Sequence, residues 1–241
     1  MSFLRRHRTY LVHVYTASTL VFVVLGMEWV LSGDYGLALA MMAVTILIDA
    51  TDGLLARRFR VKETASGVDG ALLDNIVDFL SYVALPMLFL LKAEMLLLPV
   101  TLWVSFVMFA SAFGFSRTTA KLADKGFFVG FPSYWNILVF YLYLLRTPAT
   151  FNTLLIVLLS LLVFVPVRFL YVSRLSKGRT LHFALGAGWG LLCLLALFLP
   201  LGAFRTNLLY LSLAYPVFYT LHSLLLDLRT RQPDLLARLG L

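Results

Sequence analysis

Four aspartates in two pairs are spaced so that each pair lies on one face of a helix. Asp49 and Asp52 are three residues apart, and Asp74 and Asp78 are four residues apart. Side chains at these separations are neighbours on an α-helix. Four carboxylates gathered beside a membrane repel one another and are costly to remove from water, whereas Mg²⁺ and Mn²⁺ bind carboxylate oxygens well. The spacing therefore predicts a metal site shared by two helices.

Small residues and one arginine accompany the acidic pairs. Gly53 directly follows Asp52, and Gly70 stands four residues before Asp74. Residues without a bulky side chain allow a helix or a nucleotide to approach closely. A guanidinium group offers a planar fork to diphosphate oxygens. These properties predict a substrate-binding set that consists of Gly53, Ala56, Arg57 and Gly70.

A carboxylate-lined ion or proton transporter is the alternative from a different class, because acids inside a membrane also mark transport pathways. A transporter would not require Gly53, Ala56 and Arg57 in register with the acids, so the pattern favours an enzyme. Isolated aspartates near the ends of apolar segments are instead expected to be solvated or to cap helices. These are Asp34, Asp69 and Asp124.

The composition predicts an all-α integral membrane protein. The chain has 241 residues, of which 61% are hydrophobic and 13% are charged, and its mean hydropathy is +0.91. A soluble domain carries about 25% charged residues. A membrane span needs about 20 apolar residues, and eight segments of the chain are predicted to be such spans. They are residues 10–31, 36–56, 70–91, 95–116, 127–146, 150–171, 181–200 and 206–226. No linker divides them, so residues 1–241 are predicted to form a single membrane domain.

The basic residues predict the orientation. If the N-terminus is cytoplasmic, 17 of the 20 Lys and Arg residues fall on the cytoplasmic side. They lie in residues 5–8, 57–62, 117–125, 168–179 and 229–238. Cytoplasmic loops are rich in Lys and Arg, which predicts that both termini and the aspartates face the cytoplasm. The net charge of +8 then reflects topology and anionic lipid rather than nucleic acid.

A second informative stretch runs from Arg117 to Asn136 and contains both basic and aromatic residues. Arg117, Lys121 and Lys125 follow at four-residue steps, which predicts a basic stripe on a helical extension of the preceding span. Ordinary loop charge is one interpretation of these residues. The functional interpretation is that Arg117 and Lys121 bind substrate or lipid phosphates.

The aromatic residues of the same stretch predict a site for a quaternary ammonium group. Such a cation has no N–H to donate, so it is bound by aromatic ring faces. Tyr82 stands four residues after Asp78, and Tyr134 and Trp135 lie in the second stretch. An aromatic belt at the membrane interface is the other interpretation. We expect a cage for a quaternary ammonium group that is drawn from Tyr82, Tyr134 and Trp135.

The pattern Asp49-x-x-Asp52-Gly53-x-x-Ala56-Arg57, followed by Gly70-x-x-x-Asp74-x-x-x-Asp78, resembles the signature of the class I CDP-alcohol phosphatidyltransferase family. The twelve residues between Arg57 and Gly70 exceed the commonest family spacing, which lengthens the predicted cytoplasmic linker. The segments VKETASGVDGALLDNIVDFLSY and FFVGFPSYWN look most like the bacterial branch that uses choline. The branch that uses serine is the main alternative within the family.

The resemblance implies an enzyme of phospholipid biosynthesis in the bacterial inner membrane. Its reaction transfers the phosphatidyl group of CDP-diacylglycerol to choline and yields phosphatidylcholine and CMP. The resemblance assigns metal ligation to Asp49, Asp52 and Asp74, and it makes Asp78 both the catalytic base and a neighbour or ligand of the second metal. It further implies two Mn²⁺ (or Mg²⁺) ions and a homodimer.

Overall fold

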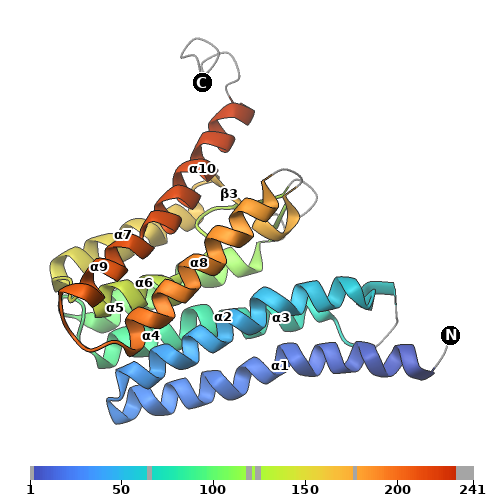
Figure 1. The fold of residues 1–241 in the computed structure, drawn as a ribbon, viewed down its shortest axis with the longest axis horizontal. Helices are drawn as coiled ribbons and strands as arrows, with labels where there is room; N and C mark the ends of the chain where they lie inside the picture. The colour runs from blue at the N-terminus through green and yellow to red at the C-terminus, as the bar shows by residue number, and fades with distance from the viewer. Residues whose placement is uncertain (1–2, 64–66, 118–120, 123–125, 176–177, 232–241) are drawn as a thin grey trace. The chain divides into compact units, whose positions relative to one another are not determined.

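The structure is a computed structural model that describes residues 3–63, 67–117, 121–122, 126–175 and 178–231. Its elements divide the chain into two compact units, both dominated by helices (Figure 1). Unit 1 consists of Met1–Met108 and Tyr134–Phe140, and unit 2 consists of Phe109–Ser133 and Tyr141–Leu241. The predicted aspartate site lies in unit 1.

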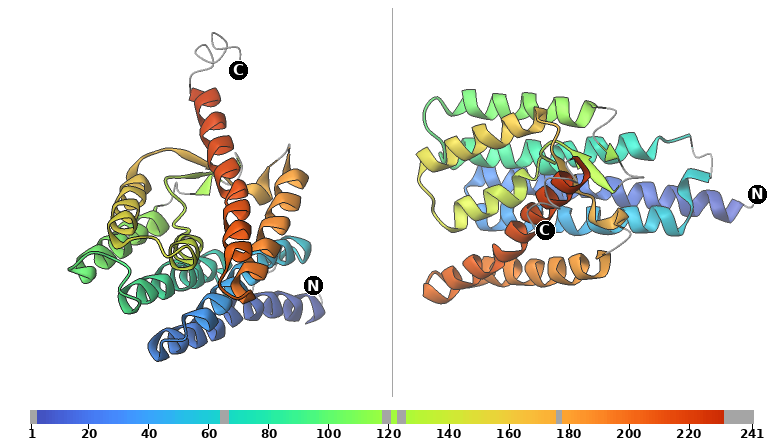
Figure 2. Two further views of the ribbon diagram at one scale, coloured as in Figure 1. Left: turned by 60° about the vertical axis from the view of Figure 1, so that its left-hand side comes forward. Right: turned by 90° about the horizontal axis from the view of Figure 1, so that it is seen from above.

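Three long helices form the main part of unit 1. Helix α1 (Phe3–Ser32) packs beside α2 (Tyr35–Arg58), which is followed by the short 3₁₀ turn η1 (Val61–Glu63). The third helix runs without interruption from Gly70 to Lys92, as α3 (Gly70–Asp78), the π-helical η2 (Phe79–Ala84) and α4 (Leu85–Lys92). Figure 2 shows these helices alongside one another. The first parts of α5 (Val100–Ser116) and α6 (Trp135–Leu144) complete the unit.

Two aspartates fix where the helices of unit 1 begin. Asp34 is the N-cap of α2, and its side chain accepts a hydrogen bond from the Leu37 N–H. Asp69 is the N-cap of α3 and accepts hydrogen bonds from the backbone N–H groups of Ala71 and Leu72, at 3.0 and 3.1 Å. Such caps satisfy N–H groups that have no partner within the helix. The capping role expected for both residues is confirmed, whereas Asp124 lies outside the described residues.

Unit 2 combines helices with a small antiparallel sheet. Its helices are the second parts of α5 and α6 together with α7 (Ala149–Phe164), α8 (Arg179–Phe198), α9 (Ala203–Ser212) and α10 (Ala214–Arg231). The strands are β1 (Lys121–Leu122), β2 (Phe127–Val129) and β3 (Arg168–Leu170), in the order β1-β2-β3. Phe128 is paired with Lys121 on one side and with Phe169 on the other. The 3₁₀ turn η4 (Val172–Arg174) follows β3.

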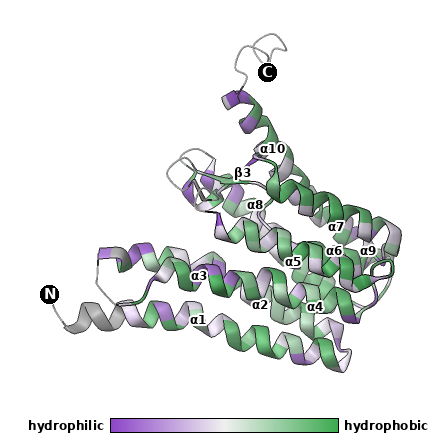
Figure 3. Cartoon of the chain, turned by 180° about the vertical axis from the view of Figure 1, so that it is seen from behind, coloured by the Kyte–Doolittle hydropathy of each residue, from purple (hydrophilic) through white to green (hydrophobic). Residues whose placement is uncertain are grey.

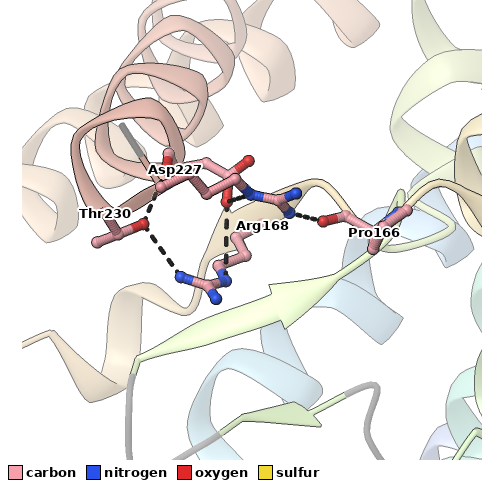
Figure 4. Close-up of polar contacts among 5 residues, drawn as sticks. Pro166, Arg168, Asp227 and Thr230 are labelled. Atoms are coloured by element: carbon pink, nitrogen blue, oxygen red, sulfur yellow. Dashed lines mark hydrogen bonds and ion pairs between the residues drawn. The ribbon is translucent and has the colours of Figure 1, made fainter. Parts of the chain in front are cut away.

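One face of α10 holds β3 through residues spaced four apart. The Tyr219 hydroxyl donates to the Leu170 carbonyl at 2.8 Å, and the Leu170 N–H donates to Ser223 Oγ at 3.1 Å. Further along α10, the buried Asp227 accepts from Arg231 Nε at 2.9 Å and pairs with Arg168 Nε at 3.7 Å (Figure 4). A buried carboxylate is stable only when it is paired and hydrogen-bonded, so this network anchors the sheet to the helix.

Two predicted spans begin or end differently from the prediction because glycine and proline interrupt them. Residues 127–146 were predicted to be one helix, but β2 and a loop precede α6. Gly130 has φ +87°, and a Cβ there would collide with the Val163 carbonyl oxygen, so the chain needs glycine at this point. The predicted span 150–171 likewise ends at Phe164, because the residue before Pro166 is extended and cannot continue a helix.

Among the residues that the structure describes, five helices are long and apolar enough to cross a membrane, judged by length and composition. They are Thr9–Ser32, Tyr35–Arg58, Gly70–Lys92, Arg179–Phe198 and Ala203–Arg231. Three shorter apolar helices, α5, α6 and α7, accompany them in the described part of the chain. Figure 3 shows hydrophobic residues along most of α2 and α4, with hydrophilic residues gathered toward the end of α2. These helices confirm a membrane protein built mainly of α-helices, with a small sheet that was not predicted. The count of eight spans and the cytoplasmic termini stay predictions.

Candidate metal centre

The second and third helices of unit 1 bring three of the predicted acidic residues together. Asp49 lies on α2, and Asp74 and Asp78 lie on α3 one turn apart. One carboxylate oxygen from each residue lies within 4.8 Å of the other two. All three side chains are half-buried. Helical spacing aligns Asp74 with Asp78, and the packing of α2 near α3 adds Asp49.

The donor set suits a hard divalent cation. Two oxygens on opposite sides of one Mg²⁺ lie about 4.2 Å apart, because each Mg–O distance is about 2.0–2.1 Å. Adjacent ligands of the same ion lie about 3 Å apart, so oxygens within 4.8 Å of one another must draw closer together to share one ion. Three clustered carboxylates also repel one another unless a cation or a proton compensates their charge. The residues present thus fit Mg²⁺ or Mn²⁺.

Asp52 is not part of this three-residue cluster in the structure. Its side chain is buried, with 6% of the residue exposed. Its Oδ2 accepts a hydrogen bond from Thr16 Oγ1 at 2.8 Å, so α1 supplies a donor for this acid. The sequence predicts that all four aspartates share one metal site, and for Asp52 this stays a prediction.

The aromatic residue predicted to face choline also contacts the acidic cluster. The Tyr82 hydroxyl donates a hydrogen bond to Asp49 Oδ2 at 2.6 Å. Tyr82 lies in the π-helical η2, which begins directly after Asp78. π-Helical turns occur frequently at functional sites. Here Tyr82 links the third helix of the unit to the acid on α2.

The other two aromatic residues of the predicted cage differ in their accessibility. The rings of Tyr82 and Tyr134 have centroids 6.2 Å apart and are tilted by 51°. Tyr134 is half-buried, whereas Trp135 has 0% of its surface exposed. A cation would have to lie inside the protein to touch the Trp135 ring. Tyr82 is also buried, at 7% exposure, so Tyr134 is the most accessible ring of the predicted cage.

The predicted small residues lie beside two specific side chains. A Cβ on Gly53 would lie 3.4 Å from Arg57 Nη1, which places the exposed guanidinium over this glycine. A Cβ on Gly70 would lie 2.8 Å from Cε1 of His13, so α1 approaches the start of α3 closely. Ala56 is half-buried on α2. Both glycines of the motif therefore make room for a neighbouring side chain.

The basic stripe predicted after the fourth span does not form a helix. Helix α5 ends at Ser116, and Lys121 lies in strand β1, so the predicted helical extension is wrong. Cross-strand pairing with β2 competes with helix formation at this point. Arg117 is half-buried directly after α5, and Lys125 lies outside the described residues. Phosphate binding by Arg117 and Lys121 stays a prediction.

Sequence reasoning missed the contribution of α1. His13 and Thr16 are both buried, at 8% and 7% exposure, and each contacts a helix that carries acidic residues. The signal was present in the sequence. Polar residues recur along one face of an otherwise apolar span, which indicates a face that packs against protein rather than lipid. These residues are Thr9, His13, Thr16 and Thr19.

The sequence was compared with protein families and with curated proteins, and both comparisons found related proteins. The profile of the CDP-alcohol phosphatidyltransferase family matches residues 10–218. A protein named phosphatidylcholine synthase from Legionella pneumophila is 46% identical over 170 residues, which cover 68% of this chain and 65% of the relative. One from Legionella bozemanae is 44% identical over 145 residues, covering 59% and 66%, so the chain spans slightly less than two thirds of both relatives. One from Borreliella burgdorferi is 30% identical over 225 residues, which cover 92% of this chain and 95% of the relative.

Proposed function

Because the chain belongs to the CDP-alcohol phosphatidyltransferase family, we propose that it transfers the phosphatidyl group of CDP-diacylglycerol to choline and releases CMP. The observation that carries this proposal is the cluster of Asp49, Asp74 and Asp78, which occupy three of the four acidic positions of the family motif. The relatives that bear the name phosphatidylcholine synthase support choline as the acceptor. The product is then phosphatidylcholine.

The acidic residues would hold two divalent ions, Mn²⁺ or Mg²⁺. Asp49, Asp74 and Asp78 offer the clustered oxygens, and Asp52 is the proposed fourth ligand. When bound, such ions polarise phosphate oxygens and neutralise the charge that develops on the leaving group. The hydrogen bond from Tyr82 fixes one oxygen of Asp49, and this leaves the orientation of that carboxylate less free.

The bond changes assign a role to Asp78 and to the groups around the diphosphate. The choline hydroxyl oxygen attacks the phosphorus of the phosphatidyl group, its proton passes to Asp78, and the bond from this phosphorus to the bridging oxygen breaks as CMP leaves. Arg57 is proposed to bind the diphosphate as a planar fork. Gly53, Ala56 and Gly70 leave room for the substrate and the neighbouring helices. Arg117 and Lys121 are proposed as further phosphate contacts.

The acceptor site is proposed to use the aromatic residues. The tilted Tyr82–Tyr134 pair offers ring faces for the trimethylammonium group, and Trp135 is proposed to complete the cage. Tyr82 then has two functions, since its hydroxyl holds Asp49 while its ring faces the acceptor. This arrangement would bring the choline hydroxyl close to the acidic cluster.

Substitutions at the tyrosines should separate these two functions. Replacing Tyr134 with Leu should raise the choline KM by about 2- to 30-fold, the equivalent of ~0.5–2 kcal/mol of cation–π attraction, and leave the CDP-diacylglycerol KM nearly unchanged. Replacing Tyr82 with Phe keeps the ring face, so the choline KM should stay near its original value. The variant lacks the hydroxyl that donates to Asp49, so we expect kcat to fall. Steady-state kinetics with each substrate varied in turn measure both effects. Tyr134→Phe is the matched control, and an equal loss in Tyr134→Phe and Tyr134→Leu would contradict the cage.

We also propose the full topology of the domain. Eight spans would place both termini in the cytoplasm, because 17 of 20 basic residues then lie on that side. The location would be the bacterial inner membrane, with the metal site open to cytoplasmic nucleotide. A homodimer is the proposed assembly. In α8, Gly186 faces Tyr215 of the same chain, whereas a Cβ on Gly190 would meet no atom of the described residues within 4 Å. Small residues such as Gly190 allow a helix of a second copy to approach closely.

Cysteine labelling tests the orientation. Single cysteines introduced at Arg60 and Arg179 should react with an impermeant thiol reagent only when the cytoplasmic face is accessible, in a background where Cys193 is replaced. A cysteine at Glu94 should react from the opposite face, because it lies between the third and fourth predicted spans. Labelling of all three positions from one face would overturn the proposed topology.

The reaction itself is tested by its requirements. Purified protein should release CMP from CDP-diacylglycerol only when choline and Mn²⁺ or Mg²⁺ are both present, and excess chelator should abolish the release. A carboxylate-lined transporter would consume no CDP-diacylglycerol. Release of CMP at the same rate without a divalent ion would contradict the proposed role of the acidic cluster.

A further inference from the structure

Helix α1 contacts both helices that carry the acidic residues. Thr16 on α1 donates to Asp52 on α2, at 2.8 Å between Oγ1 and Oδ2. The preceding residue, Tyr15, forms a 2.7 Å hydrogen bond with Thr51. His13, one turn earlier on α1, packs against Gly70, the first residue of α3. The metal-binding acids thus lie on helices that α1 holds on one side.

The contact between Thr16 and Asp52 is buried on both sides. Thr16 is 7% exposed and Asp52 is 6% exposed. An ionised carboxylate can only accept hydrogen bonds, and a buried one requires donors. Threonine is branched at Cβ, so its hydroxyl has few positions open to it in a helix. The bond therefore restricts both the rotamer of Asp52 and the direction of its second oxygen.

We propose that Thr16 is a positioning residue, which orients Asp52 as a ligand of the divalent metal; this inference rests on the proposed function. In this role Thr16 would act through the carboxylate of Asp52, to which it donates a hydrogen bond, and not by ligating the metal itself. Residues that hydrogen-bond to metal ligands typically change metal affinity or activity by about 10- to 100-fold when they are replaced. Thr16 would thereby make the first span a support for the metal site.

The packing at Gly70 supports this role for α1. A Cβ at position 70 would approach His13 Cε1 to 2.8 Å, which is closer than real Cβ contacts allow. A larger residue at this position would displace the His13 ring or move the start of α3, and Asp74 lies only one turn further along α3. Helix α1, which carries the hydrogen-bond donor to Asp52, therefore also lies in close contact with the start of the helix that carries Asp74 and Asp78.

Three variants of the full-length protein test the proposal. Thr16→Val keeps the shape of the side chain and removes the donor, Thr16→Ser keeps the donor, and Thr19→Val changes a buried threonine one turn further along α1. We expect Thr16→Val to weaken Mn²⁺ binding and to lower kcat by about 10- to 100-fold each. Thr16→Ser and Thr19→Val should remain close to the original protein. Mn²⁺ binding is measured by electron paramagnetic resonance of free Mn²⁺ in detergent solution, without substrates.

A double-mutant cycle decides whether Thr16 acts through Asp52. Adding Thr16→Val to Asp52→Asn should cause no further loss of Mn²⁺ affinity, because the carboxylate that Thr16 is proposed to orient is already absent. Additive losses, unchanged Mn²⁺ binding in Thr16→Val, or equal losses in Thr16→Val and Thr19→Val would each overturn the proposal. If Thr16→Val does not yield folded protein, Thr16→Ala is judged by the same measurements.

The metal-binding readout keeps this test distinct from the test of the reaction. A protein that binds Mn²⁺ but releases no CMP with choline would contradict the proposed function and still report the effect of Thr16. A protein that releases CMP while Thr16→Val binds Mn²⁺ normally would contradict the positioning role alone.

Discussion

Replacing Asp49 or Asp74 with Asn should lower kcat by about 10³-fold or more, because a bound metal ion contributes several kcal/mol of charge stabilisation and each 1.36 kcal/mol is tenfold in rate. Asparagine keeps the size of the side chain and removes the negative charge that attracts the ion. Both residues belong to the carboxylate cluster of unit 1. The Mn²⁺ affinity of each variant should fall together with its rate, and the two are measured on the same purified preparation.

Asp34→Asn is the matched control for these variants. Asp34 lies at the start of α2, the helix that carries Asp49, and its side chain caps that helix. Asparagine caps a helix about as well as aspartate, so activity and stability should hardly change. Turnover that survives in Asp49→Asn or Asp74→Asn, with metal still required, would show that these carboxylates do not hold the catalytic ion.

Replacing Asp78 with Asn should lower kcat by about 10²- to 10⁴-fold, the usual contribution of a general base. The choline hydroxyl is a weak nucleophile until its proton is removed. Asp78 lies at the end of α3, one turn after Asp74, where an acceptor beside the cluster can reach it. The KM for CDP-diacylglycerol should change far less than kcat, since Arg57 and the other ligands remain in place.

Metal content separates the two proposed roles of Asp78. Mn²⁺ stoichiometry and affinity are determined for Asp78→Asn next to the original protein. A loss of rate with metal binding intact supports the base. A loss of one bound ion that accounts for the whole decrease in rate would contradict a separate role in proton transfer.

The acidic motif was predictable because its spacing is local. Asp74 and Asp78 share a face in any helix, and Asp69 caps the helix that carries them. The meeting of Asp49 with these acids depends on how α2 packs near α3, which the matched positions of the family motif implied and the structure shows. The partner of Asp52 was not predictable in this way, because Thr16 lies 36 residues away on α1.

The sheet of unit 2 could not be predicted from sequence patterns, because its strands are too short. Its strands are two or three residues long, and β2 pairs with β3 across about forty residues of chain. Strands this short show no alternation that distinguishes them from the end of an apolar helix. Gly130 and Pro166 marked the interruptions, but only the tertiary contacts of Phe127, Phe128 and Leu170 turn the interruptions into strands.

Tyr82 shows how a residue can be identified correctly while part of its role is missed. Its position four residues after Asp78 suggested a ring face beside the acids. The structure places its hydroxyl 2.6 Å from Asp49 Oδ2, on the neighbouring helix. The π-helical η2 alters the helical phase after Asp78, so ideal α-helical spacing did not predict this contact.

An acceptor panel is the most direct test of the central claim. Purified protein is incubated with CDP-diacylglycerol and Mn²⁺, and choline, serine, glycerol phosphate or inositol is added in turn. CMP release and the lipid product are measured by chromatography and mass spectrometry. We expect CMP and phosphatidylcholine with choline, and little CMP with the other three acceptors. Preferential release of CMP with serine, accompanied by phosphatidylserine, would contradict the choline assignment, and no release with any acceptor would contradict phosphatidyl transfer.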